Sequence, residues 1–285
     1  MAKPKTYTAR SSIAELNRAF YERYDPRFLF NKAITLRAIT TERDRFVEAI
    51  SAFESYGEMK PYIDDHYFEA LRAELHFIET HQFEAFFALM MAAFQDKPHW
   101  LYLTDYKNEQ VKAAVERFLV GDVASLTGGA ITTERDFVVR AIYEGWTPRR
   151  PDWDTNLDNH WWLLQRMAMR YLAAAGAAEY NAYKHGVRVM TGPSFWSLGD
   201  DDAPLIVQES PDSISYLDLR KTEEGYLRLY EVTKQFNPEE SFFYLNLMQR
   251  MLDTMTKLRR VRLTGEPQEG QVHIILDRNY LGLVG

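Results

Sequence analysis

The sequence predicts a mainly α-helical protein: a helical bundle built from a duplicated helical hairpin, with a small β-hairpin and a long C-terminal helix. Three observations carry this prediction. Apolar residues recur at helical spacing through the first two thirds of the chain. A stretch of thirteen residues returns almost unchanged 92 residues later, and the last third changes to a strand-like composition before a strong helix signal.

Composition places the chain among ordinary globular proteins. It has 285 residues, of which 46% are hydrophobic and 26% charged. The net charge of -7 excludes a global basic field directed at nucleic acid or anionic lipid, although a local basic patch stays open. The absence of cysteine excludes disulfides, thiolate nucleophiles and cysteine-based metal centres.

The longest apolar run, residues 85–94, is about half of the ~20 residues that span a bilayer, and the polar N-terminus is no secretory signal. We therefore expect a cytoplasmic protein without a membrane partner.

The first predicted segment, residues 1–37, contains a short helix. Ser12 and Glu15 have the spacing of a capping box, in which each side chain accepts a hydrogen bond from the backbone N–H of the other residue. This box predicts a helix that begins there and continues through Phe20. Residues 27–39 stay open between helix and loop.

The second predicted segment, residues 38–192, contains an internal repeat. Residues 38–50 read AITTERDRFVEAI, and residues 130–142 read AITTERDFVVRAI, with the first seven residues identical. The echo continues downstream, where DDHYF is matched by DNHWW. We interpret this pattern as a duplicated helical hairpin, with copies at about residues 38–93 and 130–186 that pair as a four-helix bundle.

Helix N-caps explain several residues of the repeat. Thr41 and Thr133 precede an acid by three residues, as expected of threonines that cap a helix. His66 and His160 follow Asp64 and Asp158 by two residues in the downstream echo. We expect each of these aspartates to cap a long helix, with the histidine packed beside it. Convergence of the two histidines on a ligand is the alternative.

The third predicted segment, residues 193–285, changes character. SISYLDL and YLRLYEV are rich in strand-forming residues and predict a β-hairpin. Asn237 and Pro238 then suit the N-cap and first position of a long helix that ends in the basic cluster 257–262. This cluster is either a favourable helix end or a phosphate-binding patch. Residues 271–277 predict one more strand, and we expect the whole segment to pack on the bundle.

One helix seam carries potential metal ligands. Glu74, His81 and Glu84 fall within one arc of the long helix in the first copy, and carboxylate with imidazole could ligate a metal or share a proton. The second copy has alanines at the matching positions, so no symmetric half-site exists. A solvated or ion-paired seam is the favoured interpretation, and no metal or cofactor is predicted.

The stretch 179–189, EYNAYKHGVRV, concentrates polar groups around a glycine. Asn181 and His185 are four residues apart and share one helix face, with Lys184 beside them. Part of this pattern is typical of a helix end, where glycine and basic residues are favoured. The functional interpretation is a site in which His185 exchanges a proton while Lys184 and Arg188 hold a phosphate.

The same stretch resembles the Arg-polar-x-x-x-His motif of the HEPN superfamily of helical-bundle domains. The resemblance implies a metal-independent ribonuclease whose site forms at a dimer interface, although other members of the superfamily are non-catalytic. Asn181 matches the polar position and His185 the histidine, whereas Tyr180 stands in place of the arginine. Arg188 or Arg170 is the candidate replacement. The similarity covers about ten residues and the helical context.

The sequence therefore predicts a HEPN-like protein associated with nucleic acid, with RNA or a protein as partner and with a homodimer as a further expectation. A degenerate metal-independent ribonuclease would use His185, Asn181, Arg188 and Lys184, and whether the protein is an enzyme stays open. The alternative is a non-enzymatic interaction or scaffold protein. A second alternative is a metal-dependent bundle enzyme that uses Glu74, His81 and Glu84.

Overall fold

The computed structural model describes residues 12–51, 63–95, 98–174, 183, 189–200, 203–221 and 225–265. The chain divides into two compact units. The first unit comprises Met1–Arg27, Phe83–Leu172 and Met248–Gly285, and the second comprises Phe28–Gln82 and Ala173–Leu247. Each unit draws on all three segments predicted from the sequence, and the boundaries of those segments stay a prediction.

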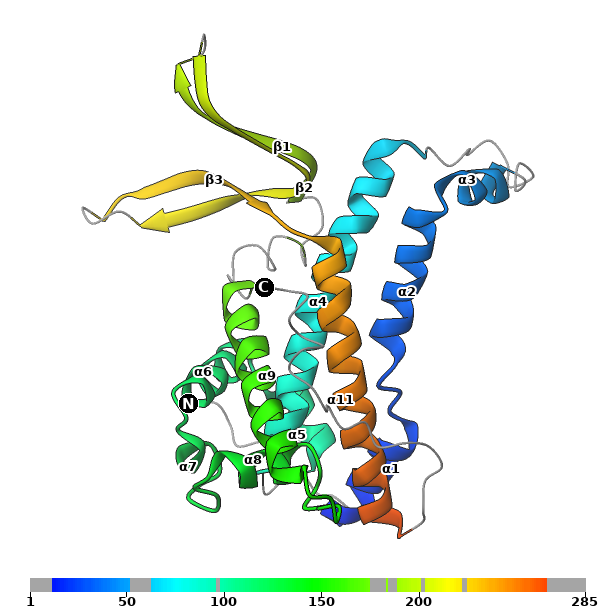
Figure 1. Ribbon diagram of the computed structural model, residues 1–285, viewed down its shortest axis with the longest axis vertical. Coiled ribbons are helices and arrows are strands. Elements are labelled where there is room, and N and C mark those ends of the chain that lie inside the picture. The colour runs from blue at the N-terminus through cyan, green and yellow to red at the C-terminus, as the bar shows by residue number, and fades with distance from the viewer. Residues whose placement is uncertain are drawn as a thin grey trace, which may run out of the picture. The chain divides into compact units, whose positions relative to one another are not determined.

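The protein is mainly α-helical, as predicted, and has a helical-bundle architecture (Figure 1). The helices before the sheet are α1 (Ile13–Arg23), α2 (Phe28–Thr41), α3 (Arg43–Ser51), α4 (Asp65–Ala92), α5 (His99–Asp105), α6 (Asn108–Leu119), α7 (Val123–Leu126), α8 (Glu134–Ala141) and α9 (Trp153–Ala174). Helix α11 (Pro238–Thr264) follows the sheet. Helices α4 and α11 are each divided between the two units, α4 after Gln82 and α11 after Leu247. No helix of the described residues is long and apolar enough to cross a membrane.

The described part of the first unit is all-helical and has an aromatic core. Phe118 lies between Phe137 and Trp161, with ring centroids 5.6 and 4.5 Å away. Three methionines of α11 are also buried in this unit, namely Met248, Met251 and Met255. Burying side chains of this size supplies about 2 kcal/mol each, so the aromatic positions dominate the stability of the unit.

Two helix starts confirm the capping predictions. At α1, Ser12 and Glu15 form the reciprocal capping box, in which the backbone N–H of Ser12 donates to Glu15 Oε2 at 2.7 Å. At α11, the Asn237 side chain accepts from the backbone N–H groups of Glu239 and Glu240 at 3.0 and 3.2 Å. These bonds satisfy donors that have no partner within the helix.

The second unit packs the start of α4 against a three-stranded antiparallel sheet. Its small core cluster joins Ala73 and Phe77 of α4 to Ile214 of the sheet, with Tyr183, Val189 and Phe236 packed around them. An ion pair between Arg72 and Asp212 links the same two elements. This local packing is how an amphipathic helix and a half-buried sheet cover each other's apolar faces.

The sheet has the order β1-β2-β3, with β1 at Val189–Asp200, β2 at Ala203–Lys221 and β3 at Leu227–Gln235. The predicted hairpin is confirmed as the pairing of β2 with β3, from Ser213 opposite Gln235 to Lys221 opposite Leu227. Strand β1 and the first half of β2 were not predicted. Figure 1 shows that the β1–β2 hairpin and the β2–β3 hairpin diverge after they share part of β2.

The two identical heptapeptides have different local structures. Residues 38–41 are the last turn of α2, whereas residues 130–133 are a loop that precedes α8. Thr133 caps α8 as predicted, since its hydroxyl accepts from the backbone N–H of Asp136 at 3.1 Å. The same prediction for Thr41 is wrong, because Thr41 is itself helical. The hairpin duplication stays a prediction.

The downstream echo also differs between its copies. Asp64 caps α4 as predicted, accepting from the backbone N–H of Tyr67 at 3.1 Å. Asp158 was expected to cap a helix as well, but α9 begins earlier, at Trp153, and Asp158 lies inside it. There it accepts two hydrogen bonds from the guanidinium of Arg135, both at 2.7 Å. The predicted strand at residues 271–277 lies outside the described residues.

Candidate functional site

The catalytic residues predicted from the sequence, Asn181, Lys184, His185 and Arg188, lie outside the described residues. Within that stretch, Tyr183 is described. Its ring stacks on Phe77 with the centroids 3.9 Å apart, and its hydroxyl donates to Glu74. Burial, together with the Glu74 carboxylate, raises the pKa of Tyr183. Tyr183 is therefore held against α4.

The proposed metal ligands do not form a cluster. Glu74 accepts hydrogen bonds from Lys32 and Tyr183, and the ring of His81 lies edge-on to Tyr183. In the portion of the chain that is described, no group of three His, Asp or Glu residues could hold a metal ion. Glu74 thus belongs to an ion-paired seam, the interpretation that the sequence favoured.

The two repeated histidines have opposite environments. His66 is exposed and its Nδ1 lies 2.9 Å from Glu69, which raises the pKa of the imidazole. His160 is buried: its Nδ1 is 2.8 Å from the carbonyl of Asn156, and its Nε2 is 3.0 Å from the hydroxyl of Tyr143. Because a carbonyl only accepts, Nδ1 carries the proton and Nε2 accepts from Tyr143. Burial lowers the pKa of His160 to about 4, so it is neutral at pH 7.

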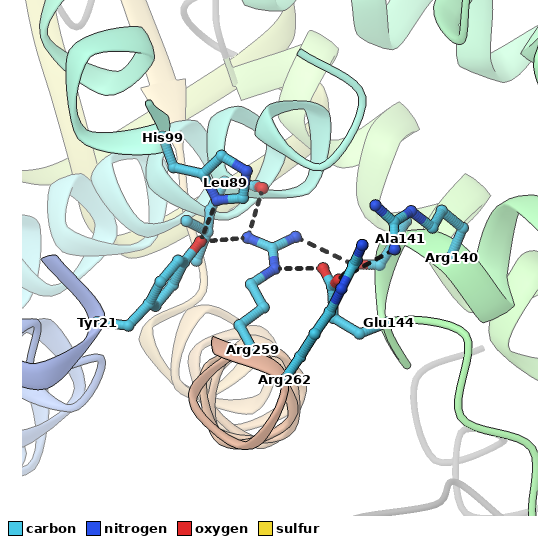
Figure 2. Close-up of polar contacts among 8 residues, drawn as sticks. All are labelled: Tyr21, Leu89, His99, Arg140, Ala141, Glu144, Arg259 and Arg262. Carbon is cyan, nitrogen blue, oxygen red and sulfur yellow. Dashed lines mark hydrogen bonds and ion pairs between the residues drawn. The ribbon is translucent and has the colours of Figure 1, made fainter. Parts of the chain in front are cut away.

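The richest polar site of the described residues is the arginine cluster of the first unit, which we define as Tyr21, His99, Arg140, Glu144, Arg259 and Arg262 (Figure 2). Its centre is the buried side chain of Arg259 on α11. Arg259 donates to Glu144 Oε1 at 2.8 Å, to the Tyr21 hydroxyl at 2.7 Å and to the carbonyl of Leu89 at 3.0 Å. It also donates to the carbonyl of Ala141 at 3.3 Å. A buried guanidinium is tolerated only with such a set of partners.

Tyr21 links Arg259 to a neutral histidine. The Tyr21 hydroxyl accepts from Arg259, so its proton points to His99 Nδ1, 2.7 Å away. The backbone N–H of His99 is held by Asn17 Oδ1 at 2.6 Å. Burial, followed by the charge of Arg259, lowers the pKa of His99 to about 4. His99 therefore adds no charge to the cluster near neutral pH.

Glu144 is the single carboxylate of the cluster and is shared by three guanidinium groups. Besides Arg259, it accepts from Arg262 at 2.6 Å and from Arg140 at 3.2 Å. Burial alone would raise the pKa of Glu144, but the surrounding arginines lower it below its ordinary value. The backbone φ of Glu144 is 52°, the left-handed region that non-glycine residues rarely adopt. Loop geometry after α8 thus aims this carboxylate at the arginines.

The cluster has two positive charges in excess, since three arginines surround one glutamate. Arg259 is buried, whereas the side chains of Arg140 and Arg262 are 33% and 53% exposed. Among the described residues, the guanidinium of Arg140 makes one hydrogen bond and the guanidinium of Arg262 makes one, both to Glu144. Burial lowers the pKa of Arg140, and the charges of Arg262 and Arg259 lower it further against the opposing effect of Glu144. These two side chains can therefore accept an additional anion.

Two other arginines of the first unit are each neutralised by neighbouring acids. Arg150 makes a two-pronged pair with Asp152, at 2.9 and 2.7 Å. Arg135 is held by Asp158 and also by Asp154, 3.1 Å away. The excess of charge around Arg140 and Arg262 is therefore a property of that place and not of every arginine in the unit.

The basic cluster predicted at residues 257–262 is divided by the fold. Arg259 is buried, and Arg260 donates to the carbonyls of Tyr21 and Tyr24, so both hold α11 to the end of α1. Arg262 is left to face solvent. Its neighbour Arg140 was missed by the sequence reasoning, although Arg140 and Glu144 have the i,i+4 spacing of a helical ion pair.

Comparison with known proteins gave no match: no family model, no curated protein and no solved structure is significantly similar to this chain.

Proposed function

We propose that this protein binds the phosphate groups of single-stranded RNA, with Arg140 and Arg262 as phosphate contacts. The observation that carries the proposal is the excess of guanidinium over carboxylate around Glu144. Guanidinium groups bind phosphate oxygens through paired, charge-assisted hydrogen bonds, and two arginines held by the same carboxylate are oriented in advance.

The charge distribution also favours a local site over a global one. The chain as a whole has a net charge of -7, so attraction to nucleic acid has to come from a place where cations outnumber acids. Partial burial strengthens that attraction, because the effective dielectric constant around Arg140 is lower than in water. Glu144 keeps the cluster folded before an anion arrives, since it holds all three arginines.

The HEPN-like resemblance supports the choice of RNA as the phosphate source. In the ribonuclease version of this proposal, His185 takes the proton of the ribose 2′-hydroxyl, Asn181 orients the imidazole, and Lys184 with Arg188 neutralises the reacting phosphate. Tyr180 in place of the motif arginine favours RNA binding over rapid cleavage. Binding and cleavage are therefore measured separately.

Binding is tested by fluorescence anisotropy with a labelled single-stranded RNA. We expect the double variant Arg140→Gln/Arg262→Gln to bind roughly tenfold more weakly, and the slope of its log Kd against log salt to fall by about 1.4. The matched control Arg135→Gln/Arg150→Gln removes two paired arginines of the same unit and should leave affinity unchanged. Equal loss in both double variants, or no RNA binding by the wild type, would refute the proposal.

Cleavage is tested in the same samples with EDTA present. The ribonuclease version expects wild-type protein to cut the RNA, and His185→Ala to stop cutting while its circular dichroism spectrum is unchanged. RNA that stays intact with the wild type removes the enzyme version and keeps the binding proposal.

A non-enzymatic interaction role is the second candidate function. A specific observation favours it, namely that the sheet of the second unit exposes several leucines to solvent. Contiguous exposed apolar surface on a soluble protein usually marks an interaction site.

A further inference from the structure

The end of the β2–β3 hairpin is a two-stranded ribbon, which we define as residues 217–221 of β2 and 227–231 of β3. Strand β1 pairs with β2 only as far as Tyr216, so within the described residues the ribbon has no third strand. Two-stranded ribbons are at best marginally stable in water without a further layer.

One face of the ribbon carries leucines that water reaches. Residues directly opposite each other in an antiparallel pair point to the same face, and every second residue along a strand does so too. Leu217, Leu227 and Leu229 therefore share a face, and they are 58%, 66% and 62% exposed. Covering this face would remove apolar area from water at about 25 cal/mol per Å².

Charges on the same face have a self-complementary pattern. Lys221 lies opposite Leu227 at one end of the ribbon, and Glu231 lies opposite Leu217 at the other end and on the other strand. A rotation of 180° about an axis perpendicular to the face, through its centre, exchanges the positions of Lys221 and Glu231. The same rotation exchanges the positions of Leu217 and Leu227. Within one chain the two charges are separated by ~13 Å along the strands, too far to pair with each other.

We infer that this face binds the same face of a second copy of the chain, about a two-fold axis that lies in the interface and runs across the strands. Sheets stacked about 10 Å apart would then place Lys221 one strand spacing, ~5 Å sideways, from Glu231 of the partner subunit. The symmetry makes this pairing twice, with leucines between. A two-fold axis along the strands would instead place Lys221 beside Lys221 of the partner subunit. The charges therefore favour the axis that runs across the strands.

This self-association does not depend on the RNA proposal, because Arg140 and Arg262 belong to the other unit. A protein partner of different sequence would not require the opposed charges at the two ends of the ribbon. The charge pattern is therefore the reason to choose a second copy as the occupant.

The inference is tested by reversing the charges of Lys221 and Glu231 and measuring the dimer Kd by analytical ultracentrifugation over a range of protein concentrations. We expect a wild-type dimer whose Kd rises at least tenfold in Lys221→Glu and in Glu231→Lys, because each variant places like charges side by side twice. An equimolar mixture of the two variants should dimerise as the wild type does, since both contacts then pair a lysine with a glutamate. The double variant Lys221→Glu/Glu231→Lys should also recover.

Two further measurements keep the inference falsifiable. Leu229→Lys should yield a monomer. The control Met169→Lys replaces an exposed apolar residue of α9 and should leave the protein dimeric. Circular dichroism shows whether each variant is folded. A wild type that stays monomeric, a dimer that survives Leu229→Lys, or a mixture that dimerises no better than its components would overturn the inference.

Discussion

The two AITTERD segments are identical in sequence and different in structure. In the second unit, residues 38–41 continue helix α2, and the backbone N–H of Glu42 donates to the carbonyl of Ala38 at 2.9 Å. In the first unit, residues 130–133 are a loop. What lies just before each segment accounts for the difference. ITLR precedes the first copy and continues a helix, whereas Gly128 and Gly129 precede the second with φ of 61° and 82°.

A single threonine then fixes the loop of the second copy. The hydroxyl of Thr127 accepts from the backbone N–H of Ile131 at 3.1 Å and donates back to the carbonyl of Val123 at 2.9 Å, so it ties the loop to the preceding helix. The first copy has no counterpart, since Thr35 bonds back to Asn31 within α2. Seven shared residues are thus too few to determine a conformation, and the neighbouring residues decide it.

The two histidines of the downstream echo also differ, in this case in their burial. His66 and His160 occupy equivalent places in the echo, yet one is exposed and the other buried. Matched substitutions in the two copies can therefore separate the effect of the residue from the effect of its surroundings.

The largest difference is expected for replacement of these histidines by alanine. His160→Ala leaves a cavity and removes the acceptor of the Tyr143 hydroxyl, and we expect the free energy of unfolding to fall by about 3 kcal/mol. His66→Ala should leave it unchanged within error, since the ring is in solvent. Urea unfolding of both variants measures the difference, and equal effects would mean that the two sites are alike.

The pH dependence of stability should differ in sign between the same two histidines. The pKa of His160 is about 4 in the folded protein and 6.5 when unfolded, so its contribution is present above pH 6.5 and lost as pH falls toward 4. Protonation of the unfolded chain then costs roughly 3 kcal/mol of stability. The pKa of His66 is raised, so its contribution is present at low pH and lost as pH rises through the folded pKa. Unfolding curves from pH 7 to 4 for the wild type and His160→Gln measure the first effect, and parallel curves would contradict it.

The smallest difference is expected at the threonines. Thr133→Ala removes the N-cap of α8 and should lower the free energy of unfolding by about 1 kcal/mol. Thr41→Ala replaces a residue inside a helix by a better helix former, so stability should be unchanged or slightly higher. Thermal unfolding of the two variants measures both values, and a loss of equal size at Thr41 would show that this threonine also acts as a cap.

Local chemistry explains what the sequence predicted well. The capping box at Ser12, the Asn237–Pro238 helix start and the β2–β3 hairpin depend on residues within a few positions of each other, and all three are confirmed. The arginine cluster was not predictable in this way. It joins α1, α5, α8 and α11, and Arg259 and Tyr21 are 238 positions apart. Nothing local distinguishes the buried Arg259 from the exposed Arg262.

The order of the residues alone was enough to determine that the chain is mainly helical, where several helices begin, and which strands form a hairpin. These properties follow from backbone hydrogen bonds and side-chain periodicity over short distances. Only the tertiary structure decided which histidine is buried and which arginines retain unneutralised charge. Burial and ion pairing depend on what packs against a residue from distant parts of the chain, and identical residues therefore acquire different chemistry.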